Sequence, residues 1–141
     1  MKLDQERHRE IVRLHVHKLP DPPPGTLSLY VVGYLDPIKI RSKRIVVLGR
    51  KVEGEEPPTI DLTPFHAGLQ GVSRHHATIR KEEGGYVIED MESVNGTWVN
   101  DKRLQPRYTY ELKSGDQVRL GQLTFFVHFA KDWDTYLKAS D

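Results

Sequence analysis

Residues 71–79, with the sequence GVSRHHATI, are the stretch that decides the fold and raises the question of function. Its end, Ala77-Thr78-Ile79, is typical of a β-strand, whereas a glycine, a serine, an arginine and two adjacent histidines stand in the same short stretch before it. A polar loop of this kind suits either a metal or catalytic histidine cluster or a site that holds an anion. Other residues of the chain decide between the histidine cluster and the anion site.

The composition of the chain excludes several classes of protein. The 141 residues fit one domain with short extensions. Lys and Arg total 21 against 20 Asp and Glu, which gives a formal net charge of +1, so no uniform basic surface would gather nucleic acid or anionic lipid. The lack of cysteine excludes disulfides, thiolate nucleophiles and cysteine-ligated zinc. Because no apolar run could span a bilayer and the N-terminus has no apolar signal core, we expect a soluble, cytoplasmic protein.

Both ends of the chain are predicted to be extensions of one domain. Residues 1–24 combine a short amphipathic helix with the proline-rich link at 20–25, which cannot continue a helix. The helix is expected to pack through a partial stripe of apolar residues: Leu3, Ile11, Leu14 and Leu19. Residues 131–141 are expected to form a C-terminal tail or short helix.

Residues 25–130 are predicted to form an all-β sandwich. Short β-branched and aromatic runs alternate there with Gly, Pro, Asn and Asp, and pairs such as Asn95-Gly96 supply the positive φ that tight hairpins need. Strands are predicted at residues 27–32, 45–48, 77–80, 86–90, 97–99, 117–120 and 123–129, with further strands near Ile60 and Tyr110.

Four polar side chains stand at predicted strand ends: Arg50, Ser73, Arg74 and Asn95. Loops at one end of a sandwich converge, so we expect these residues to share one surface. Two guanidiniums and a hydroxyl are donors suited to phosphate, and an asparagine amide can pair with a peptide backbone. This combination favours the anion site over the histidine cluster.

The order of these motifs resembles the forkhead-associated (FHA) domain, a family of β-sandwiches that bind phosphothreonine peptides. The family signature is a Gly-Arg after an early strand, a Ser-x-x-His before the next, and an Asn-Gly-Thr followed by another Asn. In this chain the signature is found at Gly49-Arg50, Ser73-Arg74-His75-His76 and Asn95-Gly96-Thr97, with Asn100 after it. The resemblance covers about residues 26–129 and implies an FHA-like sandwich of two antiparallel or mixed sheets.

The resemblance also implies roles for individual residues. Arg50 and Ser73 would hold the phosphate, Arg74 would add a contact, and Asn95 would bind the peptide main chain. Residues that would support the binding loops are Gly49, His76, Gly96, Thr97 and Asn100. The partner would be a phosphothreonine-containing protein, either a Ser/Thr kinase or its substrate, with no cofactor, metal, nucleic acid, membrane or enzymatic activity involved.

Other readings of the same residues are weaker. His75 and His76 are adjacent, so on a strand they face opposite sides and cannot hold one metal together. Ser73 lacks the Gly-x-Ser-x-Gly context of a hydrolase nucleophile. The main alternative from another class is a phosphate-independent scaffold or oligomerisation domain, and a third possibility is head-to-tail binding of phosphoacceptors within the chain, with three candidates: Thr26, Ser28 and Thr135.

Two departures from the family pattern bear on affinity. Many members have Ser or Thr before the Asn-Gly-Thr, where this chain has Val94 and offers one phosphate donor fewer. The segment after Arg50 is acidic, with Glu53, Glu55 and Glu56, and carboxylates near the site would repel phosphate and compete for Arg50.

Overall fold

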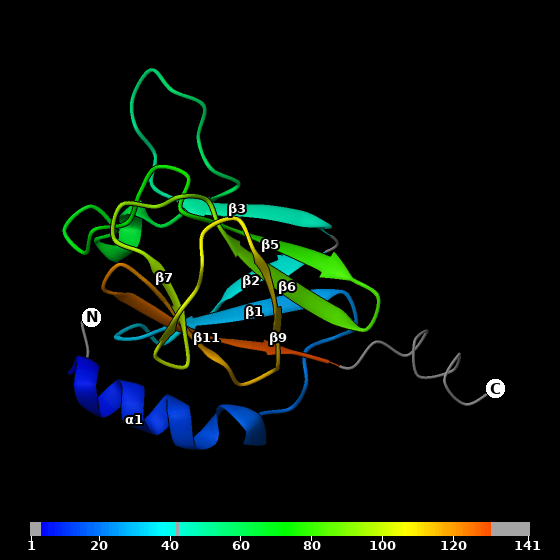
Figure 1. Cartoon of the computed structure of the whole chain (residues 1–141). Coiled ribbons are helices and arrows are strands. Elements are labelled where there is room, and N and C mark those ends of the chain that lie inside the picture. Colours follow the sequence, from blue (N-terminus) through cyan, green and yellow to red (C-terminus); the bar gives the residue numbers. More distant parts are fainter. Residues whose placement is uncertain (1–3, 42, 131–141) are drawn as a thin grey trace.

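The strands form two layers of β-sheet, and one α-helix lies outside them (Figure 1). The structure is a computed structural model that describes residues 4–41 and 43–130. Within those residues, β1 to β11 form two sheets and helix α1 precedes them. None of the helices in this part of the chain is both long and apolar enough to cross a membrane.

One sheet has six strands in the order β2-β1-β11-β10-β7-β8. Its strands, in chain order, are β1 (Thr26–Val31), β2 (Ile38–Arg41), β7 (Thr97–Val99), β8 (Lys102–Arg103), β10 (Gln117–Leu120) and β11 (Leu123–Phe129). The neighbouring strands of this sheet pair antiparallel.

The other sheet has five strands in the order β4-β3-β5-β6-β9. Its strands are β3 (Ile45–Gly49), β4 (Ile60–Asp61), β5 (Ala77–Glu82), β6 (Gly85–Asp90) and β9 (Thr109–Leu112), and the short 3₁₀ helix η2 (Thr63–Phe65) follows β4. Because β3 and β4 pair in parallel while the other pairs are antiparallel, this sheet is mixed. The predicted sandwich of antiparallel or mixed sheets is confirmed.

The core lies between the sheets and follows the two-residue period of the strands. Leu29 and Phe125 from the six-stranded sheet and Leu48 and Ile88 from the five-stranded sheet are fully buried in one cluster. Their burial in a common cluster joins the two sheets into one packed unit.

Strand β11 is buried on both faces, and helix α1 (Gln5–His15) provides part of the second cover. Asp4 caps the helix by accepting a hydrogen bond from the Arg7 backbone N–H at 3.0 Å. Val12 of α1 and Val16, the first residue of the 3₁₀ helix η1 (Val16–Lys18) that follows it, pack with Phe126 in a second apolar cluster outside the main core. This cover explains why residues 123–129 read as a nearly continuous apolar run.

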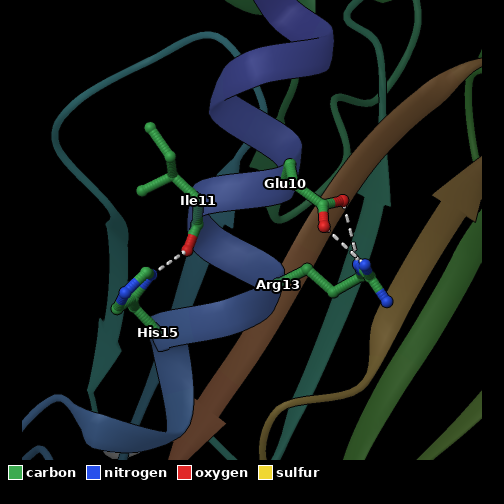
Figure 2. Close-up of polar contacts among 4 residues, drawn as sticks. All are labelled: Glu10, Ile11, Arg13 and His15. Carbon is green, nitrogen blue, oxygen red and sulfur yellow. Dashed lines mark hydrogen bonds and ion pairs between the residues drawn. The ribbon is translucent and has the colours of Figure 1, made fainter.

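The packing face predicted for α1 is wrong. Ile11 and Leu14 are 50% and 49% exposed, and Leu19 is also exposed, whereas Val12 and Val16 are buried. Figure 2 shows Ile11 on the helix surface together with the Glu10–Arg13 ion pair, while the His15 Nδ1–H donates to the Ile11 carbonyl oxygen at 2.8 Å. The apolar face that the sheet covers is therefore the valine face, a β-branched pair that fits against Phe126.

Several sequence predictions need correction or completion. The sequence did not indicate β2 or β8, and the strands near Ile60 and Tyr110 are found as β4 and β9. Thr26 and Ser28 are buried in β1, so neither is accessible as a phosphoacceptor in the folded chain. Thr135 and the predicted C-terminal tail lie outside the described residues.

The topology brings the ends of five strands, β3, β5, β6, β7 and β10, together at one end of the sandwich. The His76 backbone N–H donates to the Leu48 carbonyl near the end of β3, and the Met91 N–H after β6 donates to the His76 carbonyl. The Gly121 N–H, after β10, donates to the Gly96 carbonyl before β7. These bonds place the candidate loops side by side.

Candidate functional site

Arg50 enters the site directly from the end of β3. Its Nε–H donates to the Val72 carbonyl at 2.8 Å and its backbone N–H to the Arg74 carbonyl at 3.2 Å. The side chain is half-buried, so the guanidinium is held against the loop that carries Ser73 while its terminal nitrogens make no hydrogen bond within the described part of the chain.

Gly49 permits this contact between the β3 end and the Ser73 loop. A Cβ atom at this position would lie 1.8 Å from the Arg74 carbonyl oxygen and 2.6 Å from the Arg74 carbonyl carbon. No side chain fits so close to another backbone, so glycine is needed for the approach that sets Arg50 beside Ser73.

His76 connects two loops from the interior. Its Nδ1 accepts a hydrogen bond from the Ser73 backbone N–H at 3.0 Å, and its Nε2–H donates to the Gly96 carbonyl at 2.8 Å. The ring is fully buried. Burial lowers the pKa of His76, against the smaller opposing effects of the Gly96 carbonyl and the Asp90 carboxylate, so the ring is neutral near pH 7.

The hydroxyl of Ser73 points across to the next loop. Its Oγ accepts a hydrogen bond from the Val94 backbone N–H at 3.2 Å. Because that bond uses a lone pair, the hydroxyl hydrogen remains able to donate to an acceptor in the site.

A buried carboxylate shapes the loop that carries Asn95. This loop connects β6 to β7, which belong to different sheets, so the hairpin that Asn95-Gly96 suggested is not formed. Asp90 accepts from the Ser93 hydroxyl at 2.5 Å and from the Thr97 hydroxyl at 2.7 Å, and the Ser93 oxygen accepts from the Gly96 N–H at 3.0 Å. Ser93 is therefore committed to the turn, which leaves Val94 at the surface with 82% exposure. Sequence reasoning missed Asp90, although a carboxylate at the end of a strand, a few residues before a serine and a threonine, is a usable signal.

Asn95 lies on this β6–β7 loop. Its side-chain amide donates to the Gly71 carbonyl at 2.9 Å, and its carbonyl oxygen and second N–H have no hydrogen-bond partner among residues 4–41 and 43–130. Gly71 has φ +78° and lies so close that a Cβ there would meet the Asn95 amide nitrogen at 2.6 Å.

Arg74 is engaged by the acidic loop. Its guanidinium forms an ion pair with Glu55, and both side chains are about half exposed. The expected competition for Arg50 is not what the structure shows: Glu55 contacts Arg74, and neither Glu53 nor Glu56 forms an ion pair with Arg50 among the described residues. Arg74 thus faces the site with one carboxylate already bound.

These side chains border an open depression of about 500 Å³. It is lined by Arg50, Glu55, Ser73, Arg74, His75, Glu92 and Val94. Three of the four predicted contact residues therefore border one depression, while Asn95, the residue after Val94 in the chain, is not among its lining residues. His75, to which the sequence assigned no role, also lines it, and so does Glu92.

Asn100 lies elsewhere. Its amide donates to Asp116 at 3.0 Å and its carbonyl oxygen accepts from the Gln117 N–H at 3.0 Å, which ties the end of β7 to the start of β10. Because β7 separates Asn100 from Asn95, Asn100 supports the strand pairing and not the loops around the depression.

Comparison with known proteins agrees with this geometry. The FHA domain family matches residues 46–121. Protein FraH of Nostoc sp. is 42% identical over 77 residues, which are 52% of this chain and 26% of that protein. The chain thus spans about a quarter of the length of this curated relative.

Solved structures give the same result. The solution structure of an FHA domain from an Arabidopsis thaliana hypothetical protein is 27% identical, with a TM-score of 0.61, and covers 81% of this chain and 93% of that one. A structure from a study of phosphothreonine-dependent FHA domain interactions is 26% identical, with a TM-score of 0.56, and covers 74% of this chain and 97% of that one.

The resemblance found in the sequence is therefore confirmed in both sequence and fold. FHA domain homologues are phosphopeptide-binding modules and not a family of enzymes. The chain belongs to the FHA domain family.

Proposed function

We propose that this chain is a phosphothreonine-dependent protein-binding module that recruits partners phosphorylated by Ser/Thr kinases. The observation that carries the proposal is the set of donors around one depression: the Arg50 guanidinium, the Ser73 hydroxyl and the Arg74 guanidinium. A phosphothreonine carries about −1.5 to −2 charges near neutral pH and matches such a set.

Preorganisation supports the proposal. Arg50 is anchored to the Val72 carbonyl, and the Ser73 loop is anchored to His76, so a phosphate would meet donors that are already in place. Preorganised donors lose less conformational entropy on binding than mobile surface side chains do. The amide groups of Asn95 that have no partner in the described part of the chain are available to the main chain of a peptide.

A preference for phosphothreonine over phosphoserine needs a contact with the γ-methyl group. The exposed Val94 side chain lines the same depression as the donors and offers an apolar surface to that methyl group. The same valine supplies no hydroxyl to the phosphate, so the affinity relies on Arg50, Ser73 and Arg74.

The binding free energy of the phosphate contacts alone is marginal, so residues of the peptide that flank the phosphothreonine must contribute to affinity and selectivity. Hydrogen bonds to charged groups contribute roughly 1.5–3 kcal/mol each. Three of them give about 5–9 kcal/mol before association costs, whereas micromolar binding requires about 8 kcal/mol net. Contacts beyond the phosphate are therefore needed for a useful affinity.

The proposal is tested by titrating an oriented phosphothreonine peptide library, with phosphoserine and unphosphorylated forms, by fluorescence anisotropy. We expect saturable binding that needs the phosphate, and Arg50→Ala should weaken it by roughly 10- to 100-fold because one charged donor is lost. Arg44→Ala is the matched control, since Arg44 and Arg50 immediately precede and follow β3.

Both variants should unfold within about 1 kcal/mol of the unaltered chain, because both side chains lie outside the packed core. Normal binding by Arg50→Ala would refute the site assignment. A folded chain that binds no phosphopeptide would favour the scaffold function instead.

A further inference from the structure

The outward face of α1 carries an apolar pair, Ile11 and Leu14, that residues 4–41 and 43–130 leave about half exposed. The two residues are three positions apart, so their side chains lie next to each other on the helix surface. Val12 already packs the opposite side of α1 on Phe126. Single exposed apolar residues are ordinary, so this outward pair is informative only together with the charges around it and the chain that can reach it.

Cations stand on either side of the outward pair. Arg7 lies one helical turn before Ile11 on the same side of α1, and Lys18 follows in η1. Both are exposed, and neither forms an ion pair with another residue of 4–41 and 43–130. A segment that combines apolar side chains with carboxylates therefore matches this face in both polarity and charge.

The final eleven residues of the sequence, 131–141, have this composition and are called the C-terminal segment below; they read KDWDTYLKASD. Trp133, Tyr136 and Leu137 follow the spacing i, i+3, i+4, which places them on one face of a helix. Asp132 and Asp134 flank the first of these apolar residues. The segment therefore offers three large apolar side chains with carboxylates beside them.

The C-terminal segment begins close to the end of α1. His128 of β11 has its Nε2 3.4 Å from a carboxylate oxygen of Asp21, which follows η1 by a few residues. A Cβ atom at Gly115 would lie 4.0 Å from the Val16 side chain, and the Gly115 N–H donates to the Val127 carbonyl of β11 at 2.8 Å. Figure 1 shows α1 and β11 ending on the same side of the molecule.

We propose that the C-terminal segment packs on the outward face of α1, with its three apolar side chains on Ile11 and Leu14. The 11 residues of α1 are about 16 Å long, and a segment of equal length spans about 16 Å as a helix and about 36 Å when extended. It reaches the whole face in either form. Because it starts at the η1 end, Asp132 and Asp134 come first, near Lys18.

This packing does not depend on the proposed function. Neither Ile11 nor Leu14 lines the depression between Arg50 and Ser73. Phosphopeptide binding can therefore succeed or fail without bearing on the C-terminal segment, and the test below needs no ligand.

A double-mutant cycle on the full chain tests the proposal by thermal unfolding. Ile11→Ala should lower Tm by roughly 3–5 °C, because contact with the C-terminal segment is lost. Trp133→Ala should lower Tm by a similar amount. The double variant should melt no lower than Trp133→Ala alone, because both substitutions remove the same contact. On a bare helix surface, Ile11→Ala would instead leave Tm unchanged or raise it, since Ala has the higher helix propensity.

Ile45→Ala is the matched control. Ile45 is 55% exposed at the start of β3, in the five-stranded sheet, and Ile11 is 50% exposed. The two isoleucines are thus similarly exposed, but Ile45 lies in the other layer. Any effect of Ile45→Ala on Tm should add to that of Trp133→Ala, because the two positions share no contact.

Protein concentration separates packing within one chain from packing between two copies. Within one chain, Tm and the coupling of Ile11 to Trp133 stay constant over a wide range of concentration, and light scattering gives the mass of a monomer. A Tm that rises with concentration would overturn the proposal in favour of a second copy on this face. An unchanged Tm in Ile11→Ala, or effects of Ile11→Ala and Trp133→Ala that simply add, would also overturn it.

Discussion

His76 is the residue on which the geometry of the site loops depends. Its two ring nitrogens join the Ser73 backbone and the Gly96 carbonyl, one as acceptor and the other as donor. A protonated ring would turn an N–H toward the Ser73 N–H, which loses one hydrogen bond and sets two donors face to face. The arrangement therefore requires the neutral ring, and burial lowers the pKa of His76 in the same direction.

This lowered pKa makes stability depend on pH. In the unfolded chain the histidine pKa is about 6.5, so below that pH the unfolded state takes up a proton that the folded state does not. The free energy of unfolding should therefore fall as pH drops below about 6.5, by up to about 1.4 kcal/mol per pH unit, until the folded pKa is reached. Urea denaturation at a series of pH values from neutral to mildly acidic measures this loss.

The control compares neighbouring histidines. His76→Gln should be less stable than the unaltered chain at neutral pH but should lose less on acidification, while His75→Gln, altered at an exposed position, should behave as the unaltered chain does. Burial also lowers the pKa of His8, which contributes equally to all three proteins. An unchanged pH dependence in His76→Gln would show that another group titrates.

Strand β3 shows how an element positions a site through the residue that ends it. The strand ends at Gly49, where the backbone of Arg74 approaches too closely for any side chain. Gly49→Ala should destabilise the chain by about 3 kcal/mol and displace the Ser73 loop, because backbone atoms and not a flexible side chain stand in the way. Urea denaturation and phosphopeptide titration measure the two effects.

Gly68→Ala is the companion variant. Gly68 is exposed in the loop before Gly71, and a Cβ there would meet nothing within 4 Å. It should change stability by no more than about 0.5 kcal/mol and leave binding intact. Equal behaviour of the two variants would mean that the close approach at Gly49 does not matter.

The strands and helices also show what the sequence could predict. Alternation in residues 77–90 and 117–120 identifies β5, β6 and β10, because the core covers every second residue. Strand β11 is buried on both faces and is identified by its nearly continuous apolar run instead. It could not identify β8, which has two exposed residues, Lys102 and Arg103, and depends on pairing with β7. In α1 the larger Ile11 and Leu14 suggested the packing face, but Val12, together with Val16 of η1, packs with Phe126 instead.

In the site, too, some features could be predicted from the sequence and others depend on how the chain folds. Arg50, Ser73 and Asn95 each stand in a recognisable sequence motif, so the sequence could predict that they lie close together on one surface. The pairing of Glu55 with Arg74 could not, since the length and path of the β3–β4 loop decide which cation its carboxylate reaches.

At the scale of the molecule, the site is shared between the two sheets. Arg50 and Ser73 adjoin β3 and β5 of the five-stranded sheet, and Asn95 lies on the connection from β6 to β7, where the chain passes from one sheet to the other. Both sheets contribute to one buried cluster. A ligand that contacts all three residues is therefore bound to both layers.

Phosphopeptide binding should consequently stabilise the sandwich as one unit. At a free concentration of about 100 times Kd, a ligand that binds only the folded state adds about 2.7 kcal/mol, which should raise Tm by roughly 10 °C. Calorimetry should show one transition that moves as a whole. With Arg50→Ala at the same peptide concentration, a 10- to 100-fold weaker affinity leaves only about 0.4–1.4 kcal/mol of stabilisation, so the shift in Tm should be roughly half or less. A split transition, in which only part of the heat absorption moves, would contradict the coupling of the two sheets, because it would mean that the layer holding the phosphate can unfold separately from the other.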